Sequence, residues 1–144
     1  MKMVIAQCGP ANAGKTTTVK TMYGHLREQH PDAVVEHLID SNDISVVFTI
    51  GGIRVGIESQ GDPSARLIPS LTLFLRLECE VIICATRTWG ATVDAVRHLE
   101  NEGYSIVFRR RAREVGVAAQ EKRNRAEAQW MIEQIESMFA TATA

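Results

Sequence analysis

Long apolar runs are missing from this chain of 144 residues, although 45% of them are hydrophobic. No run approaches the roughly 20 apolar residues of a membrane-spanning helix, so no membrane partner is expected. Cysteine is also scarce, and Cys8, Cys79 and Cys84 include no closely spaced pair. Such an odd, dispersed set predicts neither a disulfide framework nor a zinc site. Each cysteine lies in or beside an apolar run, so we expect reduced thiols in the core of a cytoplasmic protein.

Net charge is small, because 16 Lys and Arg residues stand against 17 Asp and Glu residues. This near balance is unlike that of a protein that binds a long polyanion, so nucleic acid is not an expected partner. The average conceals a basic segment, since residues 109–125 contain seven basic residues and two acidic ones. We expect this segment to favour a small anion that is held locally. The length predicts one domain, 1–144.

Aromatic residues are few as well, at 6% of the chain. None of them interleaves with the arginines of residues 109–125, which argues against the binding of single-stranded nucleic acid. Trp89 stands at the start of one predicted helix and Trp130 within another, and packing in the core or at an interface is the expected use of a tryptophan at such positions.

Short apolar runs alternate with helical patterns along the chain. Strands are predicted at 3–8, 34–39, 81–85 and 104–108, and helices at 15–29, 64–77, 90–102 and 117–139. Two further β-rich runs flank Gly51-Gly52, which predicts a β-hairpin over residues 44–59. The alternation indicates a three-layer α/β fold whose sheet is mostly parallel. Ligands bind such sheets beyond the carboxyl ends of the strands, so functional residues should follow the strands.

The most specific pattern is the segment Gly9-Pro10-Ala11-Asn12-Ala13-Gly14-Lys15-Thr16, which matches G-x-x-x-x-G-K-[ST] at every fixed position. Its glycines allow a tight turn whose backbone N–H groups point at a phosphate, and the following helix adds the positive end of its dipole. Lys15 is expected to reach the β- and γ-phosphates, and the Thr16 hydroxyl to bind Mg²⁺. The pattern predicts a nucleotide-binding loop that extends to Thr17.

With this motif between a strand and a helix, residues 3–29 resemble the P-loop NTPase superfamily. The resemblance implies a P-loop NTPase-type sandwich, a bound nucleoside triphosphate and Mg²⁺ as a cofactor. Residues 56–63 also look like part of small bacterial P-loop proteins that have no assigned activity. This second resemblance implies no function of its own.

P-loop proteins usually carry an acid at the end of a second strand, where it holds Mg²⁺ directly or through water. Glu58 is one candidate for this metal and catalytic position, because Glu58-Ser59-Gln60-Gly61 is similar to the D-x-x-G turn of GTPases, with Glu in place of Asp. Gln60 is then a candidate for orienting an attacking water. Asp40 is the alternative metal ligand, placed like the strand-end acid of small P-loop kinases. Either carboxylate can instead be a solvated turn or helix cap.

Guanine specificity in GTPases comes from an N-K-x-D motif, which this chain lacks, so ATP is expected in preference to GTP. Arg87 follows an apolar strand and is a candidate for a catalytic phosphate contact. Arg109 and Arg110 lie at the end of the last strand, where the arginines of P-loop kinases form a lid or stack on the base. A solvated basic face and nucleic-acid binding are the alternatives for these arginines.

Three function classes remain open. The favoured class is an Mg²⁺-dependent nucleoside triphosphate-binding protein that acts on the γ-phosphate as a hydrolase or switch. The alternative is a kinase of a small molecule or nucleotide, which would need a phosphate acceptor and is favoured by the arginines and the acidic turn at 40–43. The third class is a nucleotide-regulated binding module without turnover, acting with a protein partner. The sequence also leaves a homo-oligomer open.

Overall fold

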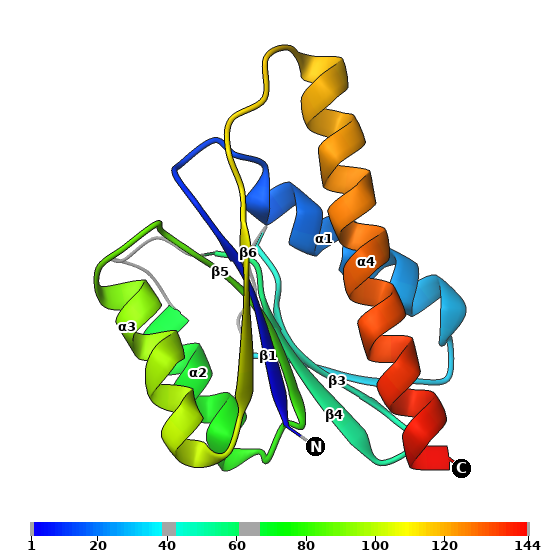
Figure 1. The fold of residues 1–144 in the computed structure, drawn as a ribbon. Helices are drawn as coiled ribbons and strands as arrows, with labels where there is room; N and C mark the ends of the chain where they lie inside the picture. The colour runs from blue at the N-terminus through cyan, green and yellow to red at the C-terminus, as the bar shows by residue number, and fades with distance from the viewer. Residues whose placement is uncertain (1, 39–42, 61–66, 144) are drawn as a thin grey trace.

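The structure is a computed structural model that describes residues 2–38, 43–60 and 67–143, with side chains to residue 140. The strands are β1 (Met3–Cys8), β2 (Val34–His37), β3 (Ser45–Ile50), β4 (Ile53–Glu58), β5 (Val81–Thr86) and β6 (Ser105–Arg110). The helices are α1 (Lys15–Gln29), α2 (Leu67–Arg76), α3 (Ala91–Arg97) and α4 (Val117–Thr143), with a 3₁₀ turn, η1 (His98–Glu102), after α3. Strands and helices alternate as the sequence predicted, and together they form an α/β sandwich (Figure 1).

The sheet has six strands in the order β2-β3-β4-β5-β1-β6. β1 pairs in parallel with β5 and β6, and β4 pairs in parallel with β5, so the carboxyl ends of these four strands meet at one end of the sheet. β3 runs antiparallel to β2 and β4, which confirms the predicted hairpin. The hairpin turn needs its two glycines, because Gly51 and Gly52 have φ angles of 57° and 81°.

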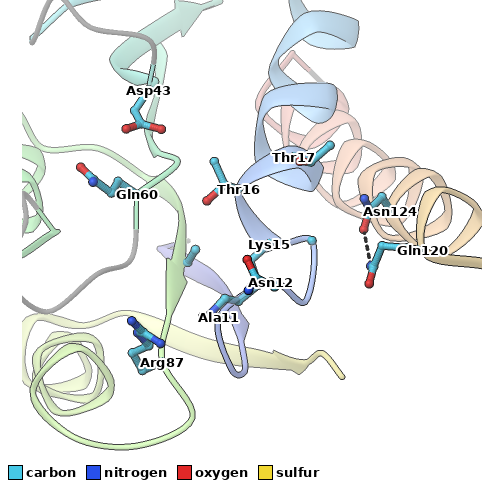
Figure 2. A pocket seen from close by; sticks show the side chains of 12 residues that line it. Ala11, Asn12, Lys15, Thr16, Thr17, Asp43, Gln60, Arg87, Gln120 and Asn124 are labelled. Carbon is cyan, nitrogen blue, oxygen red and sulfur yellow. Dashed lines mark hydrogen bonds between the residues drawn. The ribbon is translucent and has the colours of Figure 1, made fainter. Parts of the chain in front are cut away.

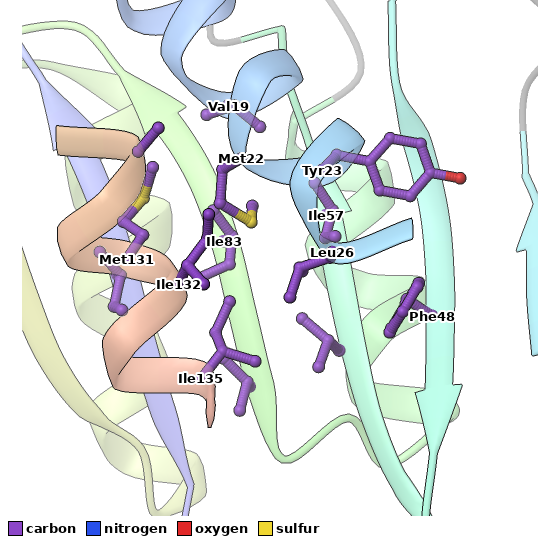
Figure 3. Packing of buried hydrophobic residues seen from close by; sticks show 14 of the residues in the cluster. Val19, Met22, Tyr23, Leu26, Phe48, Ile57, Ile83, Met131, Ile132 and Ile135 are labelled. Carbon is purple, nitrogen blue, oxygen red and sulfur yellow. The ribbon is translucent and has the colours of Figure 1, made fainter. Parts of the chain in front are cut away.

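Helices cover both faces of the sheet and bury an apolar layer on each. On one face, Val19 of α1 and Ile132 of α4 belong to the same buried cluster as Ile57 and Ile83 of the sheet (Figure 3). On the other face, α2 and α3 contribute to a second buried cluster, which contains Val4, Ala6, Leu71, Phe74, Ile82, Cys84 and Val96. Because helices lie on both sides, β5 is buried along its whole length, and this accounts for its continuous apolar sequence.

Several element boundaries differ from the sequence predictions, and of the two uses predicted for Trp89 only packing in the core is wrong. The helix predicted over 90–102 ends at Arg97 and continues as η1, which Gly103 closes with a φ angle of 91°. The last helix runs to Thr143 instead of ending at 139. Trp89 is 81% exposed and lies before α3, so it does not pack in the core. Trp130 does pack, since the Arg109 guanidinium lies 4.0 Å from its ring centroid.

All three cysteines are buried and free, as the apolar runs around them predicted. Burial raises the pKa of the Cys79 and Cys84 thiols to about 12 in each case. Thiols that stay protonated at neutral pH are weak nucleophiles, so these two are packing residues. Within the described part of the chain, no helix is both long and apolar enough to cross a membrane.

Gly56 of β4 lies against the Phe74 ring, since a Cβ added at Gly56 would sit 2.5 Å from the ring Cγ. Gly56→Ala is therefore expected to lower the free energy of unfolding by about 1–3 kcal/mol, the usual cost of overpacking a core. Urea unfolding followed by circular dichroism measures the change.

Gly24→Ala is the matched control for this substitution, because an added Cβ at Gly24 meets no atom within 4 Å. Alanine at this helical position should stabilise the protein by about 0.5–1 kcal/mol. A Gly56→Ala protein as stable as the wild type would contradict the packing of β4 against α2.

Candidate functional site

A cavity of about 520 Å³ opens at the carboxyl end of the parallel strands. Its walls come from the loop after β1, the first turn of α1, the segments beside β3 and β4, the end of β5, and α4 (Figure 2). The lining residues are Ala11, Asn12, Gly14, Lys15, Thr16, Thr17, Asp43, Gln60, Ala85, Arg87, Gln120 and Asn124. The volume lies in the range of small-ligand sites, and α/β proteins bind ligands at this end of the sheet.

The glycine loop, residues 9–16, is held in close contact with the elements behind it. A Cβ on Gly9 would lie 2.4 Å from the carbonyl oxygen of Arg111, and a Cβ on Gly14 would lie 2.2 Å from Oδ1 of Asn124. Gly14 also has a φ angle of 84°, in the left-handed region that favours glycine. Gly9 is therefore required by the backbone behind it and Gly14 is favoured by its φ angle, in both cases independently of any ligand.

Most of the predicted loop residues reach the cavity. Those that line it are Ala11, Asn12, Gly14, Lys15, Thr16 and Thr17, whereas Gly9, Pro10 and Ala13 belong to the loop but do not line the cavity. Because α1 begins at Lys15, its first backbone N–H groups have no partner within the helix. The positive end of the helix dipole thus lies at the cavity wall.

Lys15 is a buried cation, with 9% of its surface exposed. Its Nζ donates hydrogen bonds to the carbonyl oxygens of Gly9 and, at 2.6 Å, Thr86. Burial is the main cause that lowers the pKa of Lys15 to about 8, and the positive charges of Arg87 and Arg111 act in the same direction. An anion in the cavity would therefore stabilise the protonated form of Lys15.

Thr16 connects the glycine loop to the turn after β4. Its hydroxyl donates a hydrogen bond of 3.1 Å to the carbonyl oxygen of Ser59. Gln60, the next residue, lines the cavity as the sequence analysis anticipated for a residue that contacts the ligand. The end of β4 therefore contributes to the site even though β5 separates β4 from β1.

Glu58 lies behind this turn and does not line the cavity. The Glu58 side chain is fully buried, and its carboxylate accepts hydrogen bonds from Ser70 Oγ at 2.7 Å and from the Gln60 backbone N–H at 3.1 Å. These contacts anchor the turn that carries Gln60. Asp40, the alternative metal ligand, lies outside the described residues.

Asp43 is a cavity-lining carboxylate that the sequence analysis did not single out as a site residue. Its Oδ1 lies 3.7 Å from Lys20 Nζ of α1. The sequence signal was weak, because Asp43 is the last acid of a turn-rich segment and precedes a strand of the hairpin instead of following a parallel strand.

Arg87 lines the cavity from the end of β5, the position at which it was predicted. The backbone N–H of Arg87 donates to Thr92 Oγ1 at 3.0 Å, and its carbonyl oxygen accepts from Cys8 Sγ at 3.2 Å. These bonds fix its backbone between β1 and α3. Lys15 and Arg87 together make this part of the cavity positive.

Arg109 and Arg110 do not line the cavity. Arg109 forms a two-point ion pair with Glu127, with N–O distances of 3.0 and 2.8 Å, and Arg110 is exposed at the end of β6. The arginines beside the glycine loop come slightly later. The Arg111 carbonyl oxygen lies against Gly9, its backbone N–H donates at 2.7 Å to O of Cys8 just before the loop, and Arg113 Nε donates to Ala11 O at 2.8 Å.

Two polar residues of α4 complete the cavity wall. Gln120 Nε2 donates hydrogen bonds to Ala13 O and to Asn124 Oδ1, each at 3.0 Å. Only their spacing of one helical turn marks these two residues in the sequence. They bring α4 directly against the glycine loop.

The described residues contain no cluster of three His, Cys, Asp or Glu side chains that could hold a metal ion. No protein-family model, curated protein or solved structure matches the chain. The function of the site is therefore argued from its residues and their geometry.

Lys15 is expected to make the stability of the protein rise with pH. Its pKa is about 8 in the folded protein against an ordinary value of 10.5, so between these values the unfolded chain binds more protons. The free energy of unfolding of the wild type, relative to that of Lys15→Met, should rise by about 2 kcal/mol from about pH 7 to about pH 10.

Urea unfolding of both proteins across this range measures the difference. The difference in free energy of unfolding between the two proteins should not change with pH below the pKa of Lys15 in the folded protein, because Lys15 is then protonated in both the folded and the unfolded state. A gap that does not change with pH would contradict the burial of the ammonium group.

Proposed function

We propose that the chain binds a nucleoside triphosphate with Mg²⁺, ATP in preference to GTP, and acts on the γ-phosphate as a hydrolase or switch. The glycine loop carries this proposal, because its G-x-x-x-x-G-K-[ST] motif ends with Lys15 and Thr16 on the wall of the cavity. The fold that we propose is accordingly a P-loop NTPase-type sandwich. The preference for ATP rests on the missing N-K-x-D motif.

Lys15 and Arg87 supply the positive charge that the phosphates require. The Lys15 ammonium donates to backbone carbonyl oxygens of Gly9 and Thr86. A phosphate oxygen carries more negative charge than a carbonyl oxygen and accepts a stronger hydrogen bond. The phosphates therefore draw the ammonium toward the cavity and raise its pKa. The backbone N–H groups at the start of α1 add donors of fixed orientation, so the residues act by positioning and charge neutralisation.

Thr16 has the chemistry of an Mg²⁺ ligand at this place. Mg²⁺ in phosphate sites takes one or two protein oxygens and completes its coordination with phosphates and water. The Thr16 hydroxyl oxygen can present a lone pair to the ion while its O–H group continues to donate to Ser59 O. When bound, Mg²⁺ neutralises charge on the phosphates.

Gln60 is the residue that we propose to orient the attacking water. It lines the cavity, and its backbone N–H is held by the Glu58 carboxylate at 3.1 Å. The bond from Thr16 to Ser59 O ties the same turn to the glycine loop. The turn can thereby respond to the γ-phosphate, which is the property of a switch.

Lys15→Ala is expected to weaken MgATP binding by about 10- to 100-fold, the value of a hydrogen bond between charged groups. Isothermal titration calorimetry with MgATP and MgGTP measures the affinities. Lys122→Ala is the control, because Lys122 is an exposed lysine of α4 that does not line the cavity. If the wild type binds neither nucleotide, the proposed function is wrong.

Phosphate release then separates the function classes. Release from MgATP without an added acceptor supports the hydrolase or switch. Loss of ATP that depends on an acceptor supports a kinase, and tight binding without turnover supports a binding module.

A phosphotransferase is the second candidate, and Asp43 is the observation that favours it. The Asp43 carboxylate lines the same cavity as Lys15 and lies near Gln60 (Figure 2). A carboxylate facing the γ-phosphate can accept a hydrogen bond from an acceptor hydroxyl and orient it for attack.

Asp43→Asn should then lower turnover by about 100-fold, within the range of positioned acid–base groups, and leave MgATP affinity nearly unchanged. Single-turnover kinetics and calorimetry measure the two quantities separately. Asp32→Asn, a change at an exposed acid after α1, is the matched control. Equal turnover in wild type and Asp43→Asn would exclude Asp43 from the reaction.

A further inference from the structure

Arg111 is a buried cation whose hydrogen-bond partners are uncharged. The side chain is 4% exposed, and NH1 donates to Gln7 Oε1 and to Thr18 Oγ1, each at 2.8 Å. NH2 donates to Asn124 Oδ1 at 2.6 Å. Nε has no hydrogen-bond partner among the described residues. Among those residues, no carboxylate forms an ion pair with this guanidinium.

Glu127 is the buried acid of this region, but other arginines use it. Its carboxylate accepts the two-point contact from Arg109, lies 3.8 Å from Arg123 NH2, and accepts a bond of 3.3 Å from Gln7 Nε2. Burial is the main cause that lowers the pKa of Arg111. The negative charges of Glu127 and the exposed Glu114 raise this pKa, and the positive charges of Arg123 and Arg109 lower it. Arg109, Arg111 and Arg123 thus surround one carboxylate, that of Glu127, and the positive charge of the buried Arg111 is left in excess.

This charge lies directly behind the glycine loop. The carbonyl oxygen of Arg111 lies against Gly9. Thr18 Oγ1 accepts a hydrogen bond from Arg111 and donates one of 2.7 Å to Gly14 O. Asn124, the acceptor for NH2, closes against Gly14. The positive charge also lowers the pKa of Lys15. The positive charge of Arg111 therefore acts on the side of the loop that faces the cavity, where Lys15 lies.

We propose that Arg111 is a positioning residue of the anion site, a buried cation behind the glycine loop with no ion pair among the described residues, whose charge is balanced by the polyphosphate bound in front of it. This inference rests on the proposed function, since it needs an anion at the loop. A buried charge without an ionic partner is costly to keep, so the protein without a ligand gives up stability at this position. A polyphosphate recovers part of that stability, and Arg111 strengthens its binding without touching it.

Asn124→Asp tests the balance of charge with almost no change of shape. The new carboxylate lies at the position of the Asn124 amide, where its oxygen accepts from Arg111 at the present distance of 2.6 Å. We expect the melting temperature without ligand to rise, and the affinity for tripolyphosphate and MgATP to fall about tenfold. Gln129→Glu is the matched control, because it adds the same charge to an exposed position of α4. The control should leave the affinity unchanged.

Arg111→Lys and Arg111→Met separate a charge effect from a packing effect. Lysine cannot keep all three hydrogen bonds, but it keeps the positive charge. The affinity of Arg111→Lys for tripolyphosphate should therefore stay within about threefold of the wild type. Methionine removes the charge and should weaken binding about tenfold. Deprotonation of Lys15 at high pH removes a positive charge from the site and should weaken anion binding. This loss of affinity should begin at a higher pH in Arg111→Met, because one cation that lowers the pKa of Lys15 is gone. A purely structural residue would lose as much with lysine as with methionine.

The outcomes are distinct. If the wild type binds neither tripolyphosphate nor MgATP, the proposed function fails and this inference fails with it. If the wild type binds both and Arg111→Met binds as tightly, the inference alone is wrong, and any loss in Asn124→Asp is direct repulsion at the cavity wall. If Arg111→Met does not fold, Arg111→Lys decides: binding within about threefold of the wild type supports the inference, and a loss of about tenfold or more overturns it.

Discussion

Close contact between the glycine loop and the elements behind it is the constraint on which the site depends. The loop has no room for a side chain at Gly9 or Gly14, because the backbone of Arg111 and the amide of Asn124 occupy that space. The loop is therefore shaped by β6 and α4 as much as by its own sequence. Polar contacts reinforce this arrangement, since Gln120 and Arg113 each donate to a carbonyl oxygen of the loop. A rigid loop offers its N–H groups to a ligand without further ordering, which is favourable for binding.

The arrangement of strands and helices could be predicted because periodicity reports burial. Strands covered on both faces have continuous apolar sequences, as in β5. In the amphipathic helices, apolar residues recur every three or four positions. The hairpin was equally clear, because both central residues of its turn need positive φ angles that glycine adopts without cost. Boundaries were less predictable where a helix tightens into a 3₁₀ turn, since the side-chain pattern changes little there.

The loop and Arg87 could be placed from the sequence because they follow parallel strands, whose carboxyl ends share one end of the sheet. Residues brought in by α4 could not be, since Gln120 and Asn124 read as ordinary polar positions of a helix. The different roles of Arg109 and Arg111 could not be predicted from the sequence either. Alternation along β6 points Arg109 toward α4, where Glu127 and Trp130 hold it, and the chain must continue to Arg111 before a guanidinium lies under the loop. Composition alone does not tell which of these arginines is which.

The position of β1 in the sheet has a consequence for how the chain folds. β1 pairs with β5 and β6, so Met3 lies beside Val81 and Ser105. Contacts so distant along the chain require the closure of long loops and form slowly, whereas the hairpin of β3 and β4 is local and forms early. During synthesis β1 must stay unpaired until β5 has been made, and the glycine loop acquires its final shape only when β6 and α4 dock. A shortened chain without α4 would keep the whole motif and still lack the site.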